Sequence, residues 1–313
     1  TDLESTSRIP GPEVDSEGVG DLTDPQAWIA PDRADPHAEL QAEAWKAQKE
    51  RMALLEETKV SAKTWEKSPT RWWDHWLDSR EPHLWSVDVE SGEVLPVTLG
   101  TGRHLPMITP GREHFDVSPD GRHVAFVSDV DTTGTDSNYD IFLLDLGPDP
   151  AARTARNLTR DNSAGDSSPL FSPDGNHLAF GRQKIKGFYA DKVRLVIHDV
   201  GTGEQRVLTE DWDRSAAGLV WAPDSGSLFG SIDDAGHRRV YEIDASKGEP
   251  RAVTGGKSFS SLDVAGETLV GLRQGFTEPP TLVRVNPADG QVTKLSSFND
   301  DLLAGVVVLG GPM

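Results

Sequence analysis

The sequence contains no cysteine. Disulfide bonds, thiolate metal sites and cysteine nucleophiles are therefore excluded. It also contains no apolar run that approaches the roughly 20 residues a membrane-spanning helix needs, so we predict no membrane span. A cysteine-free sequence does not distinguish compartments, and both the periplasm and the cytoplasm stay open.

Basic residues are also scarce. Lys and Arg number 31 against 51 Asp and Glu, which gives a formal net charge of -20. Nucleic acids are bound by clustered cations that displace counterions from phosphates. We therefore predict neither a nucleic-acid partner nor an anionic membrane partner. Asp74, His75 and His83 lack metal-ligand spacing such as His-Glu-x-x-His, and we predict no metal and no cofactor.

The first part of the chain differs in composition from the rest. Residues 1–44 are rich in proline and hold eleven acidic but two basic side chains, which predicts an extended loop or linker. Residues 37–60 contain good helix formers and neither Gly nor Pro, which predicts a helix. We interpret residues 1–62 as an acidic linker plus a helical insertion that packs on the rim of the following domain.

From about residue 63 onward the sequence repeats. The phrases Ser118–Gly121, Ser172–Gly175 and Ala222–Ser225 begin 54 and 50 residues apart, and a degenerate copy stands at Val264–Glu267. Pro presets φ, Asp accepts backbone hydrogen bonds and Gly supplies a positive φ, so each phrase predicts a tight turn. Strand-like segments of alternating apolar residues follow each turn, as at His123–Val127. A period of about 50 residues is typical of β-propeller blades.

These repeats predict an all-β fold, a β-propeller of four-stranded blades with one helical or linker insertion near the N-terminus. We count about four and a half blades over residues 63–303, because residues 83–98 look like the outer half of a blade. Four blades are the lower limit for a closed ring. We therefore expect further blades upstream of Thr1.

Five phrases, in order, resemble the propeller part of the prolyl oligopeptidase family of serine peptidases, and in particular its dipeptidyl peptidase 5-like and acylaminoacyl peptidase-like members. The resemblance covers about residues 63–303. Tyr189 departs from the family, which often has Glu there, so no amine-anchoring role is predicted for it. The phrases are Arg71–Trp76 with His83–Trp85, Ser137–Phe142, Lys186–Leu195, Thr209–Ser215 and Phe298–Leu303.

The resemblance implies a two-domain exopeptidase of dipeptidyl or acylaminoacyl type that cleaves short peptides. Its propeller gates and selects substrates for a C-terminal α/β-hydrolase domain of the same protein, and residues 304–313 would begin the linker to that domain. No Gly-x-Ser-x-Gly nucleophile elbow occurs in this chain. We therefore predict no catalytic residue within it. Self-association is left open.

The best candidates for substrate binding lie in loops near Ser137–Leu146 and Lys186–Arg194 and in the Thr209–Ser215 phrase. An asparagine there is expected to hold a peptide carbonyl, and aromatic side chains are expected to line a hydrophobic subsite. Loop packing and blade closure would explain the same residues. The candidates are Asn138, Phe188, Tyr189, Asp191, Trp212 and Arg214.

Two other classes of propeller stay open. A TolB-like propeller that binds a protein partner without catalysis fits the repeated turns equally well. A sugar-processing or phytase-like propeller enzyme would need charged residues clustered in the central tunnel, and the sequence does not place residues there.

Overall fold

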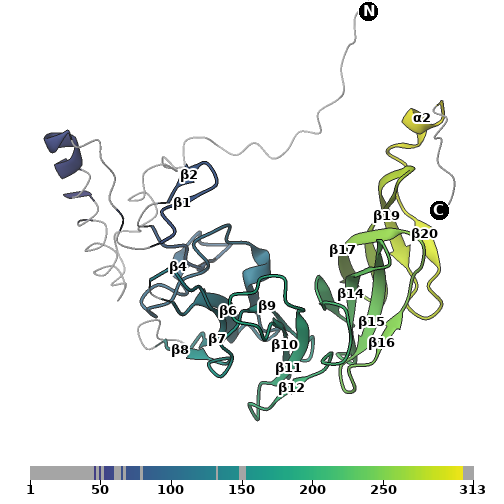
Figure 1. Ribbon diagram of the computed structural model, residues 1–313, viewed down its shortest axis with the longest axis horizontal. Helices are drawn as coiled ribbons and strands as arrows, with labels where there is room; N and C mark the ends of the chain where they lie inside the picture. The colour runs from purple at the N-terminus through teal and green to yellow at the C-terminus, as the bar shows by residue number, and fades with distance from the viewer. Residues whose placement is uncertain are drawn as a thin grey trace, which may run out of the picture.

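The computed structural model of the chain describes residues 46, 49–50, 53–59, 65, 68–77, 80–131, 133–147 and 153–305. Four antiparallel sheets of four strands follow one another along the chain, and two two-stranded sheets precede them. Figure 1 shows the sheets arranged as an arc that is open on one side. No helix in the described part of the chain is long and apolar enough to cross a membrane.

Each four-stranded sheet is one blade, and its strands lie side by side in sequence order. Blade 1 contains β5 (Phe115–Val117), β6 (His123–Asp129), β7 (Tyr139–Asp145) and β8 (Ala155–Asn157). Blade 2 contains β9 (Asp166–Phe171), β10 (His177–Arg182), β11 (Arg194–Asp199) and β12 (Gln205–Val207). Blade 3 contains β13 (Leu219–Trp221), β14 (Ser227–Asp234), β15 (His237–Asp244) and β16 (Pro250–Ala252). Blade 4 contains β17 (Ser258–Ala265), β18 (Thr268–Gly275), β19 (Glu278–Val285) and β20 (Val292–Lys294).

A half blade precedes blade 1. It consists of β3 (Trp85–Val87) and β4 (Val94–Pro96), and a small hairpin of β1 (Arg71–Trp72) and β2 (His75–Trp76) comes before it. The expected four and a half blades of an all-β propeller are thus confirmed, with the outer half blade where the sequence predicts it.

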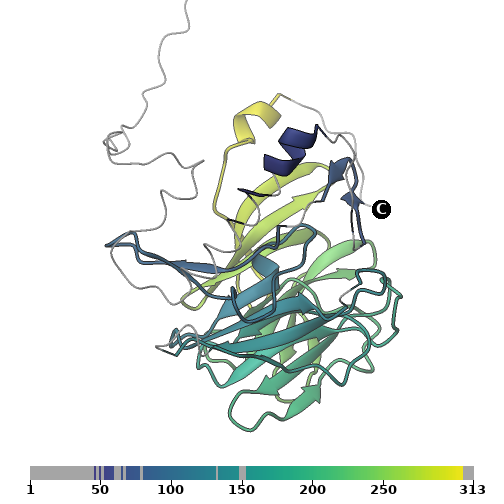
Figure 2. The same cartoon turned by 90° about the vertical axis from the view of Figure 1, so that its left-hand side faces the viewer.

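Two helical segments lie on the open side of the arc. In the N-terminal insertion, residues 46, 49–50 and 53–58 are helical, as predicted, and the other residues of the predicted 37–60 helix lie outside the described residues. A short helix α2 (Asp300–Leu303) follows blade 4. Figures 1 and 2 both show α2 and the N-terminal helical residues on this side. The predicted linker over 1–44, and residues 306–313, lie outside the described residues.

Clusters of apolar side chains hold neighbouring blades together. In β7, Ile141 and Leu143 pack into the cluster between blades 1 and 2, whereas Phe142 and Leu144 pack into the cluster towards the half blade. This division follows from the two-residue period of a strand. A strand that is buried on both faces therefore consists of consecutive apolar residues. Truncating one such side chain to alanine lowers the free energy of unfolding by about 2–5 kcal/mol.

The first strand of each blade lies on the inside of the arc, where β5 contacts β9 and β13 contacts β17. These strands precede the repeated turns, and sequence analysis did not identify them. β5 and β13 have three residues each, which is too few to show the alternation by which a strand is recognised in a sequence. The signal that could have located these strands was the repeat period of about 50 residues, because a propeller blade of that length contains four strands.

The repeated turns have the predicted structure. Ser118 Oγ donates to Asp120 Oδ1 at 2.6 Å, Gly121 N–H donates to the Ser118 carbonyl, and Gly121 has a φ of +69°. In blade 3 the glycine position is occupied by Ser225, with a φ of +59°. Ser225 Oγ accepts a hydrogen bond from the backbone N–H of Asp174, 3.1 Å away in the turn of blade 2. Ser225 thus makes a contact between blades while it adopts a left-handed backbone conformation that is unfavourable for a residue other than glycine.

Candidate functional site

The six predicted site residues lie on one face of the propeller. Because neighbouring strands are antiparallel, connections from the second to the third strand of a blade emerge on the same face as connections between blades. We call this the loop face. The opposite face, which we call the turn face, carries the repeated turns and the hairpins between third and fourth strands. The loop face consists of the connections 97–114, 130–131 with 133–138, 158–165, 183–193, 208–218, 235–236, 253–257 and 276–277, and of the segment 295–299 that follows β20.

Ion pairs join the loops of consecutive blades on the loop face. Lys186 Nζ lies 2.5 Å from Asp136 Oδ2, which links blade 2 to blade 1. Lys184 Nζ lies 2.6 Å from Glu210 Oε2, which links the same loop to the connection between blades 2 and 3. The hydrogen bond from Lys186 to Asp136 raises the pKa of Lys186, and the hydrogen bond from Lys184 lowers the pKa of Glu210. The 183–193 loop is thus anchored on both sides.

Asn138 lies in the loop of blade 1, next to a cavity of about 960 Å³. Its Nδ2 donates to Asp140 Oδ1 at 3.2 Å and to the Asn162 carbonyl at 3.5 Å. Its Oδ1 is buried and has no hydrogen-bond partner among the described residues. Both hydrogens of the amide are therefore used within the chain, and Asn138 positions Asp140 and the 158–165 connection.

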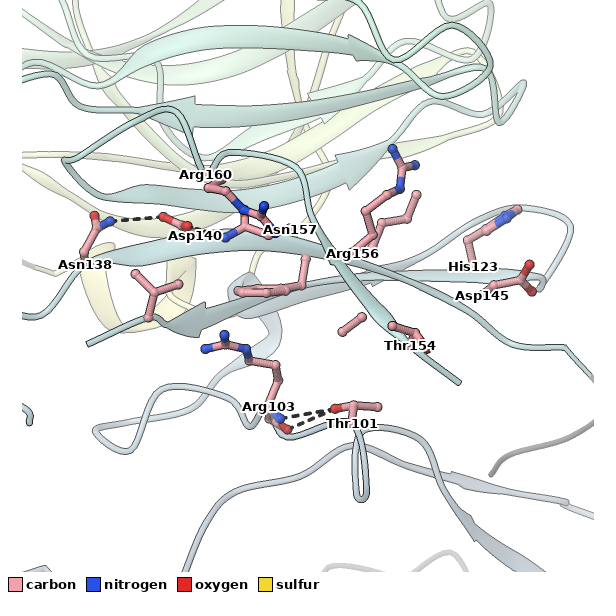
Figure 3. A pocket seen from close by; sticks show the side chains of 14 residues that line it. Thr101, Arg103, His123, Asn138, Asp140, Asp145, Thr154, Arg156, Asn157 and Arg160 are labelled. Carbon is pink, nitrogen blue, oxygen red and sulfur yellow. Dashed lines mark hydrogen bonds between the residues drawn. The ribbon is translucent and has the colours of Figure 1, made fainter. Parts of the chain in front are cut away.

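The cavity lies between the blade 1 sheet and the loop that follows the half blade. Figure 3 shows Arg103 reaching from that loop towards the strands that carry Asp140 and Asn157. The Arg103 guanidinium stands 4.7 Å from the centre of the Phe142 ring, a cation–π contact. Burial raises the pKa of Asp140, although its hydrogen bond from Asn157 and the Arg103 charge oppose the shift. The volume lies within the range of small-molecule sites.

Phe188, Tyr189 and Asp191 share the 183–193 loop but have different surroundings. Phe188 and Tyr189 are 49 % and 93 % exposed, whereas Asp191 is buried. Asp191 Oδ2 accepts hydrogen bonds from the backbone N–H of Lys184 at 2.6 Å and from Arg194 Nη1 at 3.1 Å. Burial raises the pKa of Asp191, but these hydrogen bonds outweigh it and hold the pKa below its usual value. Asp191 therefore anchors the loop that presents the two aromatic side chains.

Trp212 and Arg214 lie in the connection between blades 2 and 3. Trp212 packs against the core between these blades, with its ring centre 5.2 Å from that of Tyr241. Arg214 Nη2 donates to Asp234 Oδ1 at 2.9 Å. The hydrogen bond from Arg214 is the main cause of a lowered pKa at Asp234. Both side chains thus hold the connection against blade 3.

Exposed aromatic side chains gather on the loop face. Phe276, between β18 and β19, is 95 % exposed, and Phe298, after β20, is 89 % exposed. Trp73 is 80 % exposed, and its segment is joined to this face by a hydrogen bond from Ser68 N–H to the Thr133 carbonyl. The turn face has no exposed aromatic side chain among the described residues.

The structure therefore brings Phe188, Tyr189 and Asp191 together in one loop. The ion pair between Lys186 and Asp136 joins this loop to the blade 1 loop that contains Asn138. Lys192 joins it to Trp212. Lys192 Nζ donates to the Trp212 carbonyl at 2.7 Å. Sequence analysis did not single out the anchoring residues, because their partners lie in another blade or in the connection between blades. It also did not choose three exposed apolar residues, Ile185, Phe276 and Phe298, as site residues. The missed residues are Lys184, Ile185, Lys186, Glu210, Phe276 and Phe298.

No protein-family model matches the chain. Among curated proteins, dipeptidyl-peptidase 5 of Porphyromonas gingivalis is 27% identical over 239 residues, which cover 74% of this chain and 34% of that protein. Dipeptidyl-peptidase 5 of Aspergillus fumigatus is 27% identical over 274 residues, which cover 77% and 37% respectively. The chain thus spans about a third of the length of these relatives.

Two solved structures share the fold. The acylaminoacyl peptidase of Pyrococcus horikoshii has a TM-score of 0.58 and 18% identity, over 79% of this chain and 36% of that chain. The β-propeller domain of the Trilobed protease from Pyrococcus furiosus has a TM-score of 0.50 and 17% identity, over 71% and 60%. These likenesses show that the chain has a β-propeller fold. The predicted resemblance to the prolyl oligopeptidase family, and to its dipeptidyl peptidase 5-like and acylaminoacyl peptidase-like members, is confirmed.

Proposed function

We propose that this chain is the gating and substrate-selecting propeller of a serine exopeptidase that cleaves short peptides, of dipeptidyl or acylaminoacyl type. The names of its curated relatives support the activity. The observation that carries the assignment of roles is the one-sided distribution of exposed aromatics, which marks the loop face as the face that meets the rest of the enzyme. Aromatic side chains are enriched at interfaces, whereas isolated soluble surfaces expose few of them together.

The domain arrangement follows from this assignment. Residues 1–62 form the linker and helical insertion, residues 63–303 form the blades, and residues 304–313 begin the linker to an α/β-hydrolase domain. The hydrolase domain supplies the nucleophilic serine, the histidine base and the oxyanion hole. The chain itself has no Gly-x-Ser-x-Gly elbow, so the propeller selects and orients peptides and does not cleave them.

The six candidate residues divide into two roles in this proposal. Phe188 and Tyr189, which are exposed, contact the peptide or the facing domain. The others position the loops through contacts within the chain. These positioning residues are Asn138, Asp191, Trp212 and Arg214.

The test is fluorophosphonate labelling of the protein made from the coding region extended past Met313, with the 313-residue chain as control. The proposal expects a labelled serine beyond Met313, hydrolysis of short peptides by the extended protein, and no label on the control. An extended protein that never labels and cleaves no peptide would remove the enzyme assignment and favour a propeller that binds a protein partner.

A further inference from the structure

The loop from Gln183 to Asp191 is fixed by its own hydrogen bonds. Gln183 Nε2 donates to the carbonyls of Tyr189 and Asp191 at 3.0 and 2.9 Å. Asp191 Oδ2 accepts from the backbone N–H of Lys184 and Ile185 at 2.6 and 3.1 Å. Two consecutive turns follow, closed by N–H bonds from Phe188 to Ile185 and from Asp191 to Phe188. A loop satisfied in this way presents its side chains in one arrangement.

The charges at the base of the loop are neutralised by its neighbours. Lys184 pairs with Glu210, and Lys186 pairs with Asp136. The Asp191 carboxylate pairs with Arg194. Every charged side chain from Gln183 to Asp191 therefore has an ion-pair partner, which favours an uncharged partner over an acidic or basic one at this part of the loop.

Three large apolar side chains project from this anchored loop. Ile185 is 53 % exposed, and Phe188 and Tyr189 stand three and four residues further on. The turn from Ile185 to Phe188 keeps these two residues close together. We call Ile185, Phe188 and Tyr189 the apolar tip. Trp212, which sequence analysis grouped with the two aromatics, is half-buried in a different connection and packs against the core between blades 2 and 3, so Ile185 is the third apolar side chain of this loop.

We propose that the apolar tip is a specificity element that binds one apolar side chain of a short peptide substrate; this inference rests on the proposed function. Three side chains of one loop offer far less than the roughly 1,000 Å² that a stable protein–protein interface buries in total. They match the size of a single ligand side chain. Because the loop is already ordered, binding involves little loss of conformational entropy.

The experiment uses the extended enzyme and two peptide series that differ in one residue, leucine or phenylalanine in the first and glycine in the second. Tyr189→Ala and Phe188→Ala are each expected to lower kcat/KM about tenfold for the apolar series, and less than twofold for the glycine series. Tyr189→Phe is expected to retain the preference. Phe276→Ala, which removes an equally exposed aromatic in blade 4, is the matched control and is expected to leave the preference unchanged.

The outcomes separate this inference from the proposed function. If the variants label with fluorophosphonate but lose activity equally on both series, the tip contacts the facing domain, and the specificity role is overturned while the peptidase assignment stands. If both variants keep the full preference, the role is also overturned. If the unmodified extended protein neither labels nor cleaves, the proposed function fails, and the specificity role fails with it. Thermal unfolding of each variant confirms that it is folded.

Discussion

The carboxylate of Asp116 in β5 accepts a hydrogen bond from the backbone N–H of Phe171 in β9, over 2.7 Å from Oδ2 to nitrogen. Blades 2 and 3 are joined similarly on the inside of the arc, where Trp221 Nε1 donates to the Leu170 carbonyl at 3.0 Å. Burial raises the pKa of Asp116, although the bond from Phe171 opposes the shift. Single side chains thus align the first strands of successive blades, and this alignment sets where the loops on the loop face stand.

Asp116→Ala is expected to destabilise the chain. The variant leaves the Phe171 N–H without its acceptor, and an unsatisfied buried donor costs about 1–3 kcal/mol. Urea unfolding monitored by tryptophan fluorescence measures the change. Val117→Ala, at an exposed neighbouring position, is the control and is expected to change the free energy of unfolding by less than about 0.5 kcal/mol. Equal effects for the two variants would show that the hydrogen bond does not hold the blades.

Gly248 and Gly290 are expected to be far less tolerant of substitution than Gly203. All three have a positive φ of 72–77°. A Cβ at Gly248 would lie 2.3 Å from the Leu208 carbonyl oxygen, and one at Gly290 would lie 2.1 Å from the Val253 carbonyl oxygen, whereas Gly203 has open space. Gly203→Ala should therefore cost about 1 kcal/mol from backbone conformation alone, and Gly248→Ala and Gly290→Ala should cost clearly more. Chemical denaturation of the three variants side by side tests this order.

Asp166 is expected to make stability fall as pH rises from about 4 to 6. Burial raises its pKa to about 6, against the opposing hydrogen bond and charge of Arg182, whereas an unfolded aspartate titrates near 3.9. Between these values the folded chain retains a proton that the unfolded chain has released, so its relative stability decreases as pH rises. The free energy of unfolding of the unmodified chain, minus that of Asp166→Asn, should therefore decrease by roughly 1–3 kcal/mol over this window. A difference that stays constant or grows would contradict the raised pKa.

His198→Leu is expected to stabilise the chain, and more so in acid. Neither ring nitrogen of this buried side chain has a hydrogen-bond partner among the described residues. Burial, and secondly the charge of Arg156, lowers its pKa. As pH falls below about 6.5 the unfolded chain gains a proton before the folded chain does, and stability is lost. The variant removes this loss and the unpaired nitrogens, so its gain of about 1 kcal/mol should be larger at pH 5 than at pH 8. The urea midpoint at both values measures it.

The sequence predicted local structure well and contacts between blades poorly. Ser118–Gly121 and its copies located the turns because Pro, Asp and Gly have fixed conformational roles, and alternating apolar residues, as at His123–Val127, located the strand that follows the turn. The pair of Asp136 and Lys186 joins residues fifty positions apart in two loops, and no local pattern encodes it. Trp212 was grouped with Phe188 and Tyr189 for a similar reason, since residue type does not say that its ring packs beside that of Tyr241 in the next blade.

The most direct test of the central claim is oxidative footprinting of the extended protein against the 313-residue chain, read out by mass spectrometry at individual side chains. The account predicts that Tyr189, Phe276 and Phe298 on the loop face are less oxidised in the extended protein. Val89 on the turn face should be unchanged. Protection at the turn face, with the loop-face aromatics as reactive as before, would contradict the claim that the loop face meets the rest of a peptidase.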